Sequence, residues 1–264
     1  MKRFVSVVAL SAIVLLCAFS AYAVPTIDGN LSDWGIDPSA GDLTPHGEVT
    51  YVIEDSVRWG VGPGVGGQPF DAEAMGAFRD GDTLYVAIVT GTPPEGAVNP
   101  YDSSITYAPG DLAVDFNKDG SYEFGIETTG NSDFDQGAIV RTSDGDWSEP
   151  TDFSDSSPVG IDGGTYTGYD ADIAYNNDYY GGDGYNDHYV IEMAVPLWAF
   201  QMFWGTPFTL HWTMECGNDV IELDMNAVPP VPEPATCLLL GVGLAGLAAV
   251  SRVKHTRRTV LPGI

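Results

Sequence analysis

Basic residues are scarce in this chain and are concentrated at its ends. The sequence has 10 Lys and Arg residues against 37 Asp and Glu residues, which gives a formal net charge of −27 at pH 7. Residues 24–234 hold four of the basic residues and all 37 acidic ones, so the formal charge of this segment is −33. Such a segment repels phosphate backbones and anionic lipid headgroups, so we expect no nucleic acid partner.

Cysteine is also scarce, since Cys216 is the only one between residues 24 and 234. This count excludes an internal disulfide in the segment. About 200 residues suffice for one domain with its own hydrophobic core. We therefore expect stability to come from that core and from bound metal, with Cys216 buried as a small apolar side chain rather than exposed as a reactive thiol.

Catalytic motifs are missing as well. The three histidines of the segment, His46, His188 and His211, lie far apart in sequence, and neither HExxH nor GxSxG occurs. Glu192 and a second carboxylate offer the pair that a glycosidase needs, but among 37 acidic residues such a pair arises by chance. We expect a protein that is not an enzyme, with Glu192 as a structural residue or a metal ligand; a glycoside hydrolase is the alternative.

Helical periodicity is weak, whereas short runs of β-branched and aromatic residues alternate with Gly, Asn and Asp turns. About ten short strands predict an all-β domain over residues 24–226, an antiparallel β-sandwich of jelly-roll-like type. Residues 91–110 are expected to form a loop, and residues 197–203 one helical turn. We predict strands within residues 48–54, 70–78, 83–90, 111–127, 137–141, 165–174, 188–196, 207–214 and 218–223.

The N-terminus has the three parts of a secretory signal peptide. A positively charged start precedes an apolar run over residues 4–19, and Ala21 and Ala23 form a small-x-small cleavage site. We predict a signal peptide over residues 1–23, cut after Ala23, and hence an exported protein.

The C-terminus combines a Pro-rich linker, an apolar run and a basic cluster. The linker, residues 227–234, ends in Pro-Glu-Pro, and the apolar run over residues 235–250 has 16 residues. That length is close to the roughly 17–25 residues that cross a bilayer. The basic side chains of residues 251–264 hold this end on the cytoplasmic side. We therefore predict a single transmembrane helix over residues 235–250.

This tripartite tail resembles the PEP-CTERM sorting signal of Gram-negative bacteria, with Pro232, Glu233 and Pro234 as the motif. The resemblance implies transient anchoring in the inner membrane and removal of the tail by an exosortase-type membrane protease. The protein would then reach the outer surface or the extracellular matrix. An ordinary C-terminal membrane anchor is the alternative. The chain also resembles surface proteins with this tail in residues 71–74, 110–115 and 216–219.

Two other segments resemble carbohydrate-binding family 9 and DOMON-like sandwiches. They are residues 27–34 (IDGNLSDW), which would open the domain, and residues 189–197 (YVIEMAVPL), which would hold Glu192 in a core strand. The resemblance implies a β-sandwich and a glycan ligand, although the paired tryptophans that stack on sugars cannot be identified in the sequence. Several aromatic residues offer a sugar platform, but we expect most of them to lie in the core: Tyr179, Tyr180, Tyr185, Trp198, Trp204 and Trp212.

Residues 115–123 have the spacing of a calcium-binding turn. Oxygen-bearing side chains stand at positions 1, 3 and 5, and Gly120 at position 6 permits a sharp bend. Position 12, where an EF-hand has a bidentate Glu, is Ile126, so the turn is not an EF-hand. A polar hairpin turn without metal is the alternative. The expected Ca²⁺ ligands are Asp115, Asn117, Asp119, Ser121 and Glu123.

A second candidate metal group consists of Asp71, Glu73 and Asp111, the first two on one face of a predicted strand. A solvated strand face is the alternative for this group. The acidic and amide residues of 170–187 are interpreted first as a surface loop. Together the patterns predict a secreted, surface-sorted, calcium-stabilised β-sandwich that is not an enzyme and associates with exopolysaccharide. A carbohydrate-binding module with a defined glycan ligand is the alternative.

Overall fold

The computed structural model describes residues 24–37, 42–47, 49–54, 67–176, 188–203 and 205–226. The predicted signal peptide, Pro-rich linker, membrane helix and basic tail lie outside these residues. Within the described part of the chain, no helix is long and apolar enough to cross a membrane.

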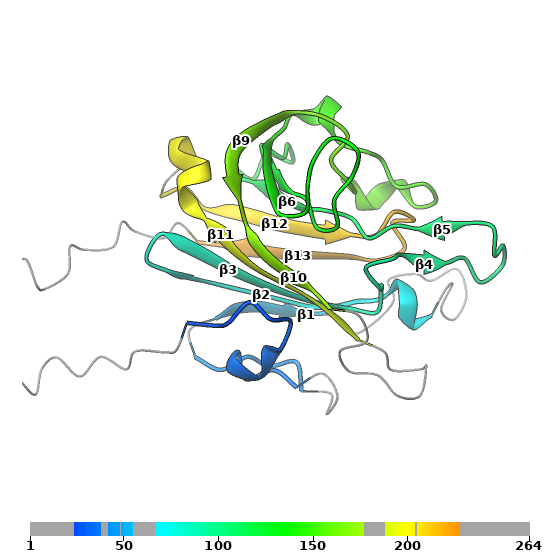
Figure 1. The fold of residues 1–264 in the computed structure, drawn as a ribbon, viewed down its shortest axis with the longest axis horizontal. Helices are drawn as coiled ribbons and strands as arrows, with labels where there is room; N and C mark the ends of the chain where they lie inside the picture. Colours follow the sequence, from blue (N-terminus) through cyan, green and yellow to red (C-terminus); the bar gives the residue numbers. More distant parts are fainter. Residues whose placement is uncertain are drawn as a thin grey trace, which may run out of the picture.

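The fold is all-β, and every strand pairing in its sheets is antiparallel (Figure 1). The first sheet has the order β1-β2-β3-β11-β10 and contains β1 (Thr50–Ile53), β2 (Ala72–Asp80), β3 (Thr83–Thr90), β11 (Tyr189–Pro196) and β10 (Asp172–Tyr175). The second has the order β13-β12-β6-β7-β8-β9 and contains β13 (Val220–Met225), β12 (Phe208–Thr213), β6 (Leu112–Asp115), β7 (Phe124–Ile126), β8 (Ala138–Arg141) and β9 (Thr165–Asp170).

The main hydrophobic core lies between these two sheets, which gives a sandwich-like arrangement. Met75 and Ile191 of the first sheet and Val114 and Leu210 of the second belong to one buried cluster. Residues at alternate positions of a strand point to one face, so each strand sends one set of apolar side chains into this layer. The burial of these side chains is the largest favourable contribution to folding.

A second hydrophobic cluster covers the outer face of the first sheet. The N-terminal segment with the short 3-10 helix η1 (Leu31–Asp33) packs there, and Trp34 shares this cluster with Val89 and Val190 (Figure 1). Strands β2, β3 and β11 are therefore covered on both faces, which explains their almost continuous runs of buried residues.

The predicted strands correspond closely to the observed ones, but the segment over residues 91–110 was expected to be a plain loop. It contains a small hairpin, β4 (Ala97–Val98) with β5 (Thr106–Tyr107). The expected helical turn at residues 197–203 is the 3-10 helix η6 (Leu197–Phe203), and Cys216 is buried as predicted. The other 3-10 segments are η3 (Gln68–Phe70), η4 (Asp144–Asp146) and η5 (Ser154–Ser156).

The strand order brings distant parts of the chain together. After a long connection, β12 returns to lie beside β6, the first strand of the β6-β7-β8-β9 meander. A late strand that returns beside the first is a feature of Greek-key connections. The jelly-roll assignment itself stays a prediction.

Candidate metal centre and buried carboxyl groups

The acidic turn joins β6 to β7 and is built around backbone conformations with positive φ. Val114 pairs with Phe124, so residues 115–123 form the hairpin connection. Gly120 has φ of 86°, which glycine adopts without steric cost, and Lys118 has φ of 59°. The side chain of Lys118 forms an ion pair with Asp224 on β13, with 2.9 Å between Nζ and Oδ1.

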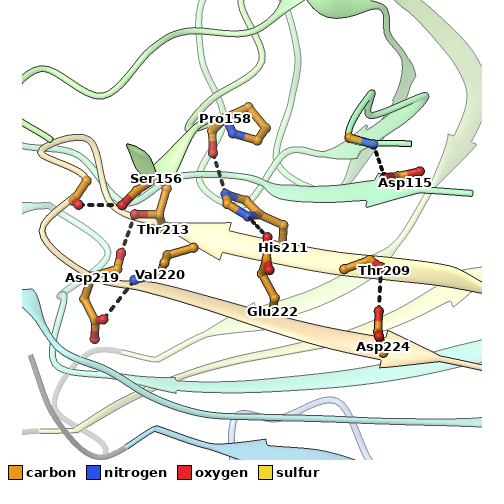
Figure 2. A network of polar contacts seen from close by, with 12 residues as sticks. Asp115, Ser156, Pro158, Thr209, His211, Thr213, Asp219, Val220, Glu222 and Asp224 are labelled. Atoms are coloured by element: carbon orange, nitrogen blue, oxygen red, sulfur yellow. Dashed lines mark hydrogen bonds and ion pairs between the residues drawn. The ribbon is translucent and has the colours of Figure 1, made fainter. Parts of the chain in front are cut away.

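The buried carboxylate of Asp115 lies at the centre of this turn (Figure 2). Its Oδ1 accepts hydrogen bonds from the backbone N–H groups of Asn117 at 3.1 Å, Lys118 at 2.6 Å and Asp119 at 3.4 Å. Its Oδ2 accepts one from the N–H of Gly120 at 2.9 Å. Four backbone donors thus wrap the chain around one carboxylate, and the single hydrogen bond to Oδ2 leaves that oxygen a lone pair for a cation.

Glu123 closes the turn from its far end. Its Oε2 accepts a hydrogen bond from the N–H of Phe116 at 2.8 Å, and its Oε1 accepts one from the side-chain amide of Asn117 at 2.9 Å. Asp119 accepts a hydrogen bond from the N–H of Ser121 at 3.0 Å. An amide oxygen and nitrogen are assigned from the hydrogen-bond network, so Asn117 would have to rotate its amide to present Oδ1 to a cation.

The structure brings three of the five predicted ligands into one group. Carboxylate oxygens of Asp115, Asp119 and Glu123 lie within 4.8 Å of one another, and in the described part of the chain no other group of three or more Asp, Glu, His or Cys residues does so. Ca²⁺–oxygen distances of about 2.3–2.6 Å place ligands on opposite sides of one ion about 5 Å apart, so this spacing fits calcium. Burial raises the pKa of Glu123, and the charges of Asp115 and Asp119 add to that effect.

The second candidate group is not a solvated strand face, because Asp71, Glu73 and Asp111 are all buried. The three side chains contact different partners. Glu73 bonds to His188, with 2.7 Å between Oε1 and Nδ1. Asp71 is hydrogen-bonded to Asp219. The physical reason is a β-bulge between Ala72 and Ala74 at the start of β2, which interrupts the simple alternation that the sequence suggested.

Asp219 directly precedes β13 of the second sheet, and its side chain bonds to β2 of the first sheet. Its carboxylate accepts hydrogen bonds from the N–H of Ala72 at 2.8 Å and of Val220 at 2.9 Å, and its carbonyl oxygen accepts one from the Thr213 hydroxyl at 2.5 Å (Figure 2). Burial raises the pKa of Asp219 to about 6, although both backbone donors oppose this effect.

Asp111 forms a buried pair with Glu127 at the opposite end of the β6–β7 hairpin. Asp111 accepts hydrogen bonds from the N–H groups of Thr128 and Ile161, each at 2.8 Å. Burial and, next, the charge of Asp111 together raise the pKa of Glu127 to about 8. Burial also raises the pKa of Asp111 to about 6, against its backbone hydrogen bonds. The pair therefore holds a proton more tightly than two separate carboxyl groups would.

Sequence reasoning missed Glu127, although a signal was present. If residues 115–123 form the turn of a hairpin, Leu112 pairs with Ile126, as the structure shows, and Asp111 then stands beside Glu127. The roles of His188 and Asp219 had no such signal, because both act across long sequence separations.

Glu192 is fully buried and accepts hydrogen bonds from three donors. Its Oε1 accepts a hydrogen bond from the indole N–H of Trp34 at 2.7 Å, and its Oε2 accepts bonds from the N–H groups of Asp28 at 3.1 Å and Gly29 at 2.9 Å. Burial raises the pKa of Glu192, and the Trp34 hydrogen bond opposes this.

The aromatic residues proposed as a sugar platform have different surroundings. Trp212 is fully buried, as expected for a core residue, and Trp198 is 45% exposed. Tyr179, Tyr180, Tyr185 and Trp204 lie outside the described residues, as does most of the acidic loop near residue 180.

The comparison with known proteins identifies the C-terminal tail. Residues 230–253 match the family model described as the PEP-CTERM protein-sorting motif, and this range includes Pro232, Glu233 and Pro234. No match was found among the curated proteins or among the solved structures. The motif implies processing by exosortase, export and sorting to the cell surface.

Proposed function

We propose that the chain is a non-enzymatic surface protein whose sandwich-like domain is stabilised by calcium. The observation that carries this proposal is the group of Asp115, Asp119 and Glu123, whose oxygens lie within 4.8 Å of one another in a turn with calcium spacing. The sorting motif at residues 230–253 supports the location, because extracellular fluids supply calcium to exported proteins. Extracellular modules bind calcium with dissociation constants of roughly 10⁻⁴–10⁻³ M.

Charge supports the same proposal. Residues 24–234 carry a formal charge of −33, and self-repulsion at such a charge destabilises a compact state. A bound cation in the acidic turn removes the repulsion among three carboxylates there. Glu123 benefits directly, since the neighbouring acidic residues disfavour its ionised form.

The test is thermal unfolding of the exported protein during a calcium titration. Magnesium and sodium at matched ionic strength serve as controls, because screening alone helps an acidic protein. We expect calcium to raise the melting temperature above both controls. Equal melting curves in all three salts would show that the acidic turn is a polar hairpin connection without a calcium site. The negative charge would then serve only solubility.

We further propose that the protein resides on the outer surface or in the matrix of a Gram-negative bacterium, in association with exopolysaccharide. The resemblance of residues 27–34 and 189–197 to carbohydrate-binding family 9 and DOMON-like sandwiches supports this association. The exposed side chains of Tyr166, Tyr169 and Trp198 favour the alternative of a module with a defined glycan ligand, because exposed aromatic rings stack on sugars. A glycan array separates the two: one specific glycan indicates a defined ligand, and weak binding to many indicates general matrix association.

A further inference from the structure

A pocket of about 330 Å³ opens beside the β4–β5 hairpin, and its lining includes neither the acidic turn nor the Asp111–Glu127 pair. Its volume lies at the lower end of the roughly 300–1,000 Å³ of small-molecule sites. Four aromatic side chains line it, from η3, the loop after β4, β5 and the loop before η5: Phe70, Tyr101, Tyr107 and Phe153.

Two of the aromatic rings stand nearly perpendicular to each other. Phe70 and Tyr107 meet edge to face, with centroids 5.8 Å apart and an interplanar angle of 80°. Tyr101 also lines the pocket but is 78% exposed, so it stands at the opening. A sugar ring stacks with the C–H groups of one face on one open aromatic ring, whereas a tetrahedral alkylated ammonium group contacts several faces set at angles to one another.

The charge of the pocket is negative. Asp152 lines it, and its Oδ2 accepts a hydrogen bond from the Tyr107 hydroxyl at 2.5 Å. Asn99 donates to the same hydroxyl oxygen at 2.8 Å. Burial and the bond to Asp152 raise the pKa of Tyr107 to about 12, so the hydroxyl keeps its proton. Among the described residues that line the pocket, none is basic, and the charge of −33 on residues 24–234 attracts cations to it.

A buried amide adds a polar function to the pocket. Asn218 lines it and is only 3% exposed. Its amide nitrogen donates to the carbonyl oxygen of Phe70 at 3.3 Å, whereas none of the described residues donates to its Oδ1. A buried acceptor without a donor costs free energy. A hydroxyl on a bound ligand would satisfy it once the Asn218 side chain turns Oδ1 toward the pocket.

We propose that this pocket binds a small organic cation with a methylated ammonium group and a hydroxyl, of which choline is the simplest probe. The aromatic walls receive the methylated group, and Asp152 supplies the countercharge. The inference goes beyond the proposed function and does not depend on calcium binding or on any glycan. The same headgroup occurs free and on phosphatidylcholine, so both sources belong in the test.

The experiment measures binding to the exported protein by titration calorimetry at constant ionic strength. The probes are choline, its neutral isostere 3,3-dimethylbutan-1-ol, glucose, and vesicles of phosphatidylcholine. We expect choline to bind about ten- to a hundredfold more tightly than the isostere, as several cation–π contacts imply. Binding of the vesicles as well would identify the lipid headgroup as a source, and binding of free choline alone would identify the free cation.

Two variants separate the pocket from the overall charge. Asp152→Asn keeps an oxygen that accepts the hydrogen bond from the Tyr107 hydroxyl but removes the negative charge. We expect this variant to lower choline affinity about tenfold. Asp155→Asn makes the same charge change in the neighbouring segment, outside the pocket lining, and should leave the affinity unchanged. The proposal is overturned if choline does not bind, if the isostere or glucose binds as tightly as choline, or if both variants weaken binding equally.

Discussion

The indole N–H of Trp34 donates a hydrogen bond of 2.7 Å to Oε1 of Glu192, although 158 positions separate the two residues in the chain. The bond joins the N-terminal segment to β11, an interior strand of the first sheet. It also links the two sequence segments, residues 27–34 and 189–197, whose resemblance to one family of sandwiches predicted their position in the domain. Through its hydrogen bonds the carboxylate of Glu192 acts as a clamp, that is, it holds the N-terminal segment against the outer face of this sheet.

Replacement of this carboxylate should destabilise the fold. In Glu192→Gln one side-chain oxygen becomes a donor that faces N–H groups, so at least one buried hydrogen bond is lost. We expect a loss of about 1–3 kcal/mol in the free energy of unfolding, measured by denaturant titration. Glu95→Gln, the same change at an exposed position, should cost far less. Similar losses for the two variants would contradict the role of Glu192 as a clamp.

The non-enzymatic proposal predicts that the protein does not hydrolyse a broad panel of polysaccharides and esters. Glu192 is engaged by three donors, which suits a structural residue better than a general acid. Product release is followed for the wild type and for Glu192→Gln under conditions where both are folded. Turnover by the wild type that disappears in the variant would refute the prediction.

Calcium stabilisation should depend on Asp119. At a calcium concentration one hundred times the dissociation constant, binding adds about 2.7 kcal/mol, which is about 5–10 °C in melting temperature for a domain of this size. Asp119→Ala removes one of the three clustered carboxylates and should abolish most of this gain. Asp133→Ala, an exposed acidic residue outside the turn, is the matched control and should retain it. A full calcium response in Asp119→Ala would rule out the acidic turn as the site.

The Asp111–Glu127 pair predicts a dependence of stability on pH. The pKa of Glu127 rises from an ordinary value of 4.5 to about 8 in the folded protein, so the folded state binds its proton more tightly than the unfolded chain does. The corresponding stability is fully present below pH 4.5 and is lost as the pH rises through about 8.

Denaturant titrations at several pH values test this dependence. We expect the free energy of unfolding to fall between pH 4.5 and about 8 in the wild type. Glu127→Gln keeps a hydrogen-bond donor toward Asp111 but has no titrating proton, so the free energy of unfolding should fall less steeply with pH. The same change at the exposed Glu95 should leave the pH dependence as in the wild type. An unchanged slope in Glu127→Gln would show that other groups cause the decline.

Sorting should depend on the Pro-Glu-Pro motif. Replacement of Pro232, Glu233 and Pro234 by alanines removes the recognised sequence within the matched tail, so the uncut protein should remain in the inner membrane. Cell fractionation and the apparent mass of the protein report the outcome, with Pro229→Ala in the adjoining linker as the control. Normal release of the triple variant would show that the motif is incidental.

The sequence by itself determined the class of fold and the positions of most strands. Residues 83–90 and 189–196 are rich in β-branched and aromatic side chains, and both became long central strands. Local turn chemistry was equally clear: Asp115, Asn117, Asp119 and Gly120 predicted a tight acidic connection, and the structure has one there. These features depend on contacts within a few residues, which a sequence pattern records.

Only the tertiary structure decided which carboxyl groups meet. The sequence predicted that Asp71 and Glu73 lie in one metal-binding group. Because of a β-bulge and of long-range contacts, Asp71 instead interacts with Asp219 and Glu73 with His188. The pocket beside the β4–β5 hairpin likewise assembles residues from four separate segments, and no local pattern marks it. Such contacts arise from sheet order and from the packing of loops against it. They join residues more than a hundred positions apart, where periodicity and turn signals carry no information.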